Sequence, residues 1–206
     1  MYTEELEKDL YRCLGLMSMN WRKQENTSDT NSSFIYKCDT LKQCLEEIRK
    51  NNADRNYALH RWYNYKTSII TEEIFCKYGA KHCEDLYNHD VDIYITEIPF
   101  DVKLTCYPIK LFDKKPYDLS KRSGKNNMIR WLYENQSQGN RKQLVNRLYV
   151  MCDGDSYWES VINKSNFNKI EDSISKYMDY IKTHKINEIT IDNEHKILSD
   201  LICVKK

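Results

Sequence analysis

Residues 90–105, DVDIYITEIPFDVKLT, alternate apolar and polar side chains on both sides of a short break at Thr96-Glu97. Successive side chains of a β-strand point to opposite faces of a sheet, so this pattern predicts two antiparallel strands joined by a tight turn. With the turn at Thr96-Glu97, Ile93 lies opposite Phe100 and one face of the hairpin is entirely apolar. The rest of the fold has to supply a hydrophobic layer for that face.

The other face of the hairpin carries charges. The same register places Asp92 opposite Asp101, with Cβ atoms about 5 Å apart, and such facing like charges are destabilising unless a positive charge compensates them. Lys103 supplies one positive charge, and a divalent cation shared by both carboxylates is a fuller compensation. We therefore expect Mg²⁺ or Mn²⁺ here. The alternatives are an ordinary exposed sheet face and, for Lys103, an ion pair with Asp90.

A long helical stretch, from about Ala53 to Leu86, precedes the hairpin. Its helical phase places Glu72 beside the apolar stripe and Glu73 on the solvent side. Glu72 is therefore the carboxylate that we expect to point inward, toward the two aspartates. The alternatives are a break near Gly79 or a break near Ile69–Thr71. The latter would make Glu72 a first-turn residue favoured by the helix dipole.

The remaining pattern predicts an α/β (α+β) chain. We expect an N-terminal helical segment (residues 1–52) packed on a core formed by residues 53–206. Further expected features are helices at 2–24, at 39 or 40 to 50, at 128–135 and at 169–184, a polar linker at 26–33, a basic loop at 108–122, and strands at 147–153, 188–192 and 197–204.

The composition excludes several protein classes. Of 206 residues, 40% are hydrophobic and 31% are charged, which is typical of a globular and not a disordered chain. The sequence has no run of about 18 apolar residues, so we expect no membrane-spanning helix. The N-terminus lacks the basic start and apolar core of a signal peptide, so we expect a cytoplasmic protein without membrane partners. The eight cysteines are scattered, without zinc-site spacing, and are expected to be reduced core residues.

Positive charge is concentrated in residues 103–147, which hold eleven lysines and arginines against three acids in a chain of net charge +1. Such segregation favours a surface that binds a polyanion, although a solvated lysine-rich loop and helix would give the same count. DNA is the expected partner, but these residues do not separate DNA from RNA, and a homodimer is compatible with them. The candidate contacts are Lys121, Arg122, Lys125, Arg130, Gln138 and Arg141.

Asp92, an eight-residue gap and then Asp101-Val102-Lys103 resemble the D-(x)n-(D/E)-x-K signature of the PD-(D/E)xK, or restriction-endonuclease-like, nuclease superfamily. The resemblance covers residues 60–153. It implies an αβββαβ core, a central mixed sheet flanked by helices, with the acids on a hairpin and a glutamate on the preceding helix. The chain departs from some branches because it lacks their Gln-x-x-x-Tyr motif. Little room is left for a strand between the helix and Asp92.

The resemblance implies a Mg²⁺-dependent DNA nuclease. Asp92, Asp101 and the Val102 carbonyl would bind the metal, and Glu72 would complete the shell or reach a second ion. Lys103 would orient the attacking water or neutralise the transition state. The alternatives are a catalytically inactive nuclease-like protein that binds nucleic acid, and a non-enzymatic scaffold whose acids bind Ca²⁺ or a partner.

Overall fold

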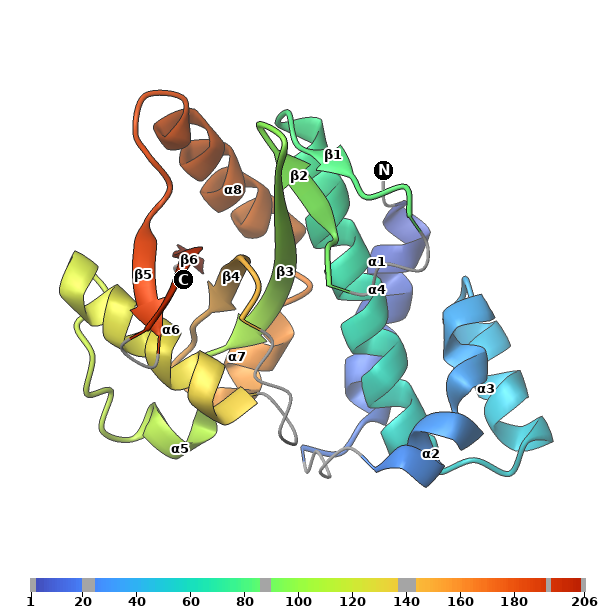
Figure 1. The fold of residues 1–206 in the computed structure, drawn as a ribbon. Helices are drawn as coiled ribbons and strands as arrows, with labels where there is room; N and C mark the ends of the chain where they lie inside the picture. Colours follow the sequence, from blue (N-terminus) through green and yellow to red (C-terminus); the bar gives the residue numbers. More distant parts are fainter. Residues whose placement is uncertain (1–2, 20–24, 86–89, 137–143, 192–193, 205–206) are drawn as a thin grey trace. The chain divides into compact units, whose positions relative to one another are not determined.

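A computed structural model describes residues 3–19, 25–85, 90–136, 144–191 and 194–204 (Figure 1). The chain divides into two compact units, Met1–Ile70 and Thr71–Lys206. The division falls inside helix α4 (Arg55–Lys77), whereas the boundary expected from the sequence, after residue 52, precedes this helix. No helix within the described ranges has the length and apolar character needed to cross a membrane.

The N-terminal unit is helical. It contains α1 (Glu4–Leu16), α2 (Asn26–Asn31), the 3₁₀ helix η1 (Ser33–Lys37), α3 (Leu41–Lys50) and the first part of α4. Thr40 caps α3: its side chain accepts from the Gln43 N–H, and the Gln43 side chain accepts in return from the Thr40 N–H. The helix expected at 2–24 is shorter, and the polar linker expected at 26–33 is wrong because α2 and the start of η1 form there.

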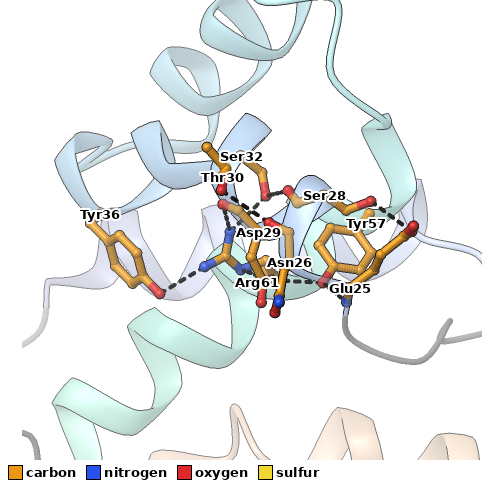
Figure 2. A network of polar contacts seen from close by, with 9 residues as sticks. All are labelled: Glu25, Asn26, Ser28, Asp29, Thr30, Ser32, Tyr36, Tyr57 and Arg61. Carbon is orange, nitrogen blue, oxygen red and sulfur yellow. Dashed lines mark hydrogen bonds and ion pairs between the residues drawn. The ribbon is translucent and has the colours of Figure 1, made fainter.

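Arg61 of α4 explains why this polar stretch is ordered (Figure 2). Its guanidinium donates to the Asp29 carbonyl at 2.6 Å, to the Ser32 hydroxyl at 2.7 Å and to the Tyr36 hydroxyl at 2.8 Å. It also lies 3.3 Å from the Asp29 carboxylate, which accepts a 2.6 Å hydrogen bond from Tyr57. Side-chain and backbone acceptors together replace the hydrophobic contacts that this segment lacks.

We expect Arg61→Ala to destabilise the N-terminal unit by about 2–3 kcal/mol, because the Asp29 carboxylate and several acceptors lose their cationic partner. Urea unfolding and amide hydrogen exchange in α2 and α4 would measure the loss. Lys50→Ala is the matched control, since its 3.1 Å pair with Glu47 is exposed and should contribute less than about 1 kcal/mol. Equal effects of the two replacements would contradict a structural role for the network.

The C-terminal unit is an α+β structure built on a six-stranded mixed sheet flanked by helices, which confirms the coarse fold class. The strand order is β1-β2-β3-β4-β6-β5. Strands β1, β2 and β3 are antiparallel, β3, β4 and β6 are parallel, and β5 is antiparallel to β6. Its elements after α4 are β1 (Lys81–His82), β2 (Ile93–Ile95), β3 (Ile98–Cys106), α5 (Ile109–Phe112), α6 (Arg122–Gln136), β4 (Arg147–Cys152), α7 (Tyr157–Asn163), α8 (Phe167–Ile181), β5 (Glu188–Ile191) and β6 (His195–Val204).

The hairpin register expected from the sequence is confirmed. Ile93 pairs with Phe100, and Ile95 pairs with Ile98. Thr96 and Glu97 form the two-residue turn with positive φ angles of 50° and 66°, as a hairpin turn that matches the strand twist requires.

The helix does not reach Leu86, and of the two expected break points the one near Gly79 is confirmed. Helix α4 ends at Lys77, and Gly79 follows with a φ angle of 104° that glycine adopts without steric cost. The chain then forms β1, which pairs with β2. A short strand therefore does lie between the helix and Asp92.

The core lies against β4, all of whose six residues are buried. Tyr149 and Met151 of β4 pack with Met128, Ile129 and Leu132 of α6 in one hydrophobic cluster. A charged residue in so apolar a strand requires a specific partner, and β4 begins with an arginine.

Candidate active site

Asp101 lies at the centre of a charged cluster. The parallel register of β3 and β4 places it beside Arg147. The Arg147 Nε donates to one Asp101 carboxylate oxygen, and the Lys103 Nζ donates to the other. Asp101 is only 3% exposed, so this carboxylate is buried with two cationic partners.

Arg147 is itself 5% exposed. Its guanidinium carbon lies 5.1 Å from the ring centroid of Tyr133 and 5.9 Å from that of Tyr149. Burial disfavours the arginine's charge, but Tyr149 and Asp101 outweigh it and raise the pKa of Arg147 above its ordinary value. This arginine is a permanent cation that holds Asp101 in place.

Asp92 belongs to the cluster and directly precedes the first residue of β2. One of its carboxylate oxygens accepts a 2.6 Å hydrogen bond from the Val102 N–H. The β2 ladder begins only at Ile93, so the Asp92 side chain takes the place of a strand partner for Val102. Burial is the main cause that raises the pKa of Asp92. The hydrogen bond from the Val102 N–H and the charge of Lys103 lower this pKa, whereas the charge of Asp101 and a hydrogen bond between the two carboxyl groups raise it further.

Glu72 of α4 completes the group. Burial raises its pKa to about 8, Asp92 and Asp101 add to the increase, and Lys103 opposes it. The structure thus brings Glu72, Asp92, Asp101 and Lys103 together, since the charges of the other three act on the pKa of Glu72. A cluster that holds two carboxyl groups with raised pKa values, Glu72 and Asp92, is typical of functional sites.

Glu73 was expected to face solvent, and this is wrong in part. It is half-buried, and one of its carboxylate oxygens is shielded from solvent. The reason is that α4 has no solvent face: between its exposed ends, Arg55 and Lys77, every residue is buried or half-buried.

The donor chemistry of the cluster suits a hard divalent cation. Burial raises the pKa values of Glu72 and Asp92, and the charges of neighbouring carboxylates add to both increases. A bound cation would relieve this crowding of negative charge. Among the described residues, no group of three or more His, Cys, Asp or Glu side chains has the arrangement that would hold a metal ion. Lys103 and Arg147 occupy the oxygens of Asp101 instead, and Val102 enters the site through its N–H.

The basic candidates lie elsewhere on the sheet. Arg122 pairs with Asp200 of β6 at 2.8 Å, and Arg130 donates to the Thr190 carbonyl of β5 at 3.3 Å. Strand β4 separates β6 and β5 from β3 and its carboxylates. The remaining candidates are Lys121, which pairs with Asp118, Lys125, which lines a cavity described below, and Gln138 and Arg141, which fall outside the described residues.

Sequence reasoning missed Arg147 as a member of the site and counted it only among the basic residues. A usable signal was present, because an arginine at the start of an otherwise apolar, buried strand must be paired. The alternative partner for Lys103, Asp90, is not the one the structure gives, since Lys103 pairs with Asp101.

Comparisons with known proteins return no match for this chain among protein-family models, curated proteins or solved structures.

Proposed function

We propose that this protein is a metal-dependent nuclease of the PD-(D/E)xK type that hydrolyses phosphodiester bonds of DNA. The observation that carries the proposal is the convergence of Glu72, Asp92, Asp101 and Lys103 on one site. The element order α4-β1-β2-β3-α5-α6-β4 supports it, because apart from the four-residue helix α5 it follows the αβββαβ order implied by the resemblance.

Glu72, Asp92 and Asp101 would hold the divalent ion, which supplies positive charge to the phosphoryl oxygens when bound. The other roles belong to the chain itself. Arg147 keeps one Asp101 oxygen fixed, so the second oxygen is presented from a defined position. The Lys103 side chain is 46% exposed, so its ammonium group can leave Asp101 to orient a water molecule or to approach a phosphate.

Plasmid cleavage in the presence of Mg²⁺, and its suppression by EDTA, would test this function. We expect Asp92→Asn to lower the cleavage rate at least about 100-fold, since it removes one of the carboxylates that would hold the divalent ion. Lys110→Ala, an exposed lysine of α5, is the control and should cleave like the parent. Cleavage that survives EDTA, or an Asp92→Asn protein as active as the control, would refute the proposal.

A second candidate is a nuclease-like protein that binds nucleic acid without cutting it. The observation favouring it is that both oxygens of Asp101 already have cationic partners, Lys103 and Arg147. Absence of cleavage together with DNA binding that weakens steeply with salt would select this alternative.

A further inference from the structure

A second site lies at the outer edge of β6. A cavity of about 690 Å³ opens there between the start of α6, one side of α8 and residues 200–203 of β6. Strand β5 pairs with β6 only as far as Leu198, so this part of β6 has no neighbouring strand on that side within the described chain. None of the cavity's lining residues comes from α4, β2 or β3, which separates it from the carboxylate cluster.

Gly124 determines how the start of α6 reaches this place. A Cβ atom at residue 124 would lie 2.0 Å from the Asp118 carbonyl oxygen, so only glycine allows the first turn of α6 to pack on the preceding loop. That close packing fixes Arg122 and Lys125 beside α8.

The cavity wall has more positive than negative charge. Four cations, Arg122, Lys125, Lys169 and Lys176, line it together with two carboxylates, Asp172 and Asp200. Both carboxylates are already engaged: Asp200 with Arg122 at 2.8 Å, and Asp172 with Lys176 at 2.6 Å.

Two ammonium groups are left over. Among the described residues, neither Lys125 nor Lys169 forms an ion pair or a side-chain hydrogen bond, although both line the cavity. Two uncompensated lysines at one cavity favour the binding of a compact anion, for which phosphate is the usual biological ligand.

The volume of the cavity and the aromatic side chains in its wall restrict the kind of ligand further. The volume lies within the range of small-molecule sites and exceeds what an inorganic anion would fill. Tyr177 and Tyr180 of α8 also line the cavity, and Tyr180 already stacks on His184, with the ring centroids 4.1 Å apart. Tyrosine rings beside lysines are the combination that binds a base and its phosphate together.

We propose that this cavity binds a nucleoside monophosphate unit, with the phosphate at Lys125 and Lys169 and the base against the tyrosines. The unit comes either from a free nucleotide or from the phosphorylated end of a nucleic-acid strand. The assignment does not depend on nuclease activity, because it uses none of the residues of the carboxylate cluster.

Calorimetric titrations in EDTA, on the parent protein and on the Asp92→Asn protein, would test it. The probes are AMP, inorganic phosphate, and a short single strand carrying either a 5′-phosphate or a 5′-hydroxyl group. We expect AMP or the 5′-phosphorylated strand to bind at least 10-fold more tightly than inorganic phosphate. Lys125→Gln/Lys169→Gln should weaken that binding at least 10-fold, while Lys110→Gln/Lys185→Gln, two exposed lysines outside the cavity, should not change it.

The probes separate the two sources. A strand end is identified if the 5′-phosphorylated strand binds more tightly than AMP and the 5′-hydroxyl strand does not bind. A free nucleotide is identified if AMP binds more tightly than the 5′-phosphorylated strand. Equal affinity for AMP and inorganic phosphate, no binding of any probe, or equal binding by the two double variants would overturn the proposal. Because Asp92→Asn should bind like the parent, a failed cleavage assay leaves this result unaffected.

Discussion

Arg147→Met should lower the free energy of unfolding of the C-terminal unit by about 3–5 kcal/mol at neutral pH. Arg147 and Asp101 are both almost fully buried, so removing the guanidinium leaves Asp101 with only the half-exposed Lys103 as a cationic partner. A buried charge that loses its partner costs far more than an exposed ion pair contributes. Urea unfolding, together with amide exchange of β3 and β4, would measure the change.

The double variant Arg147→Met/Asp101→Asn separates loss of the arginine's packing from loss of charge compensation. It should recover part of the lost stability, because neither charge is then buried alone. Lys115→Ala is the matched control, since the 2.9 Å pair of Lys115 with Asp153 is 41% exposed on both sides and should contribute less than about 1 kcal/mol. If Arg147→Met costs no more than this control, Arg147 does not hold Asp101 in the way described.

Glu72→Gln should make the metal-free protein more stable at pH 9 while changing little at pH 4. The folded structure raises the pKa of Glu72 to about 8, chiefly through burial. A carboxyl group with a raised pKa stabilises the fold in its protonated form, so its contribution is complete below the unfolded value near 4.3. It is lost progressively as the pH rises to about 8. Glutamine mimics the protonated group at every pH, and its advantage should reach a few kcal/mol in alkaline solution.

Unfolding in EDTA across this pH range would measure the effect, with Glu134→Gln, an exposed position of α6, as the control. Added Mg²⁺ should stabilise the parent more at pH 8 than at pH 6, because metal binding has to displace the Glu72 proton. Glu72→Gln should lose most of this pH dependence. A variant whose stability runs parallel to the parent from pH 4 to pH 9 would show that Glu72 titrates as an ordinary surface carboxylate.

The hairpin was predictable because its information is local. A period-two pattern around a two-residue turn fixes which side chains face one another, and the observed pairing of Ile93 with Phe100 follows from it. The helical repeat placed Glu72 inward and Glu73 outward, but both are half-buried, so this short-range rule did not separate the two glutamates. Strand β1 was missed because two residues are too few to show any period.

Contacts between elements far apart in the sequence carry no such local signal. Arg147 meets Asp101 across 46 residues of sequence, and Arg122 meets Asp200 across 78. The sequence shows that residues 103–147 are basic, but it does not show which of these charges form ion pairs inside the fold. Nor does it show that Arg122 and Lys125 lie beside β6 and not beside β3. Only the sheet order fixes those positions.

The central position of β4 has a consequence for how the protein folds. Both of its neighbours are parallel strands about 50 residues away in the chain, since Asp101, Arg147 and Ser199 share one register. Parallel pairing over such separations requires the closure of large loops, and the entropy cost of this closure comes before any stabilising contact forms. We therefore infer that this sheet folds slowly. Until β6 docks, β4 presents RLYVMC as an unpaired apolar edge that ends in a thiol. A chain in which β6 has not yet docked would expose this edge to other chains, so reducing conditions and low protein concentration should favour recovery of the native chain.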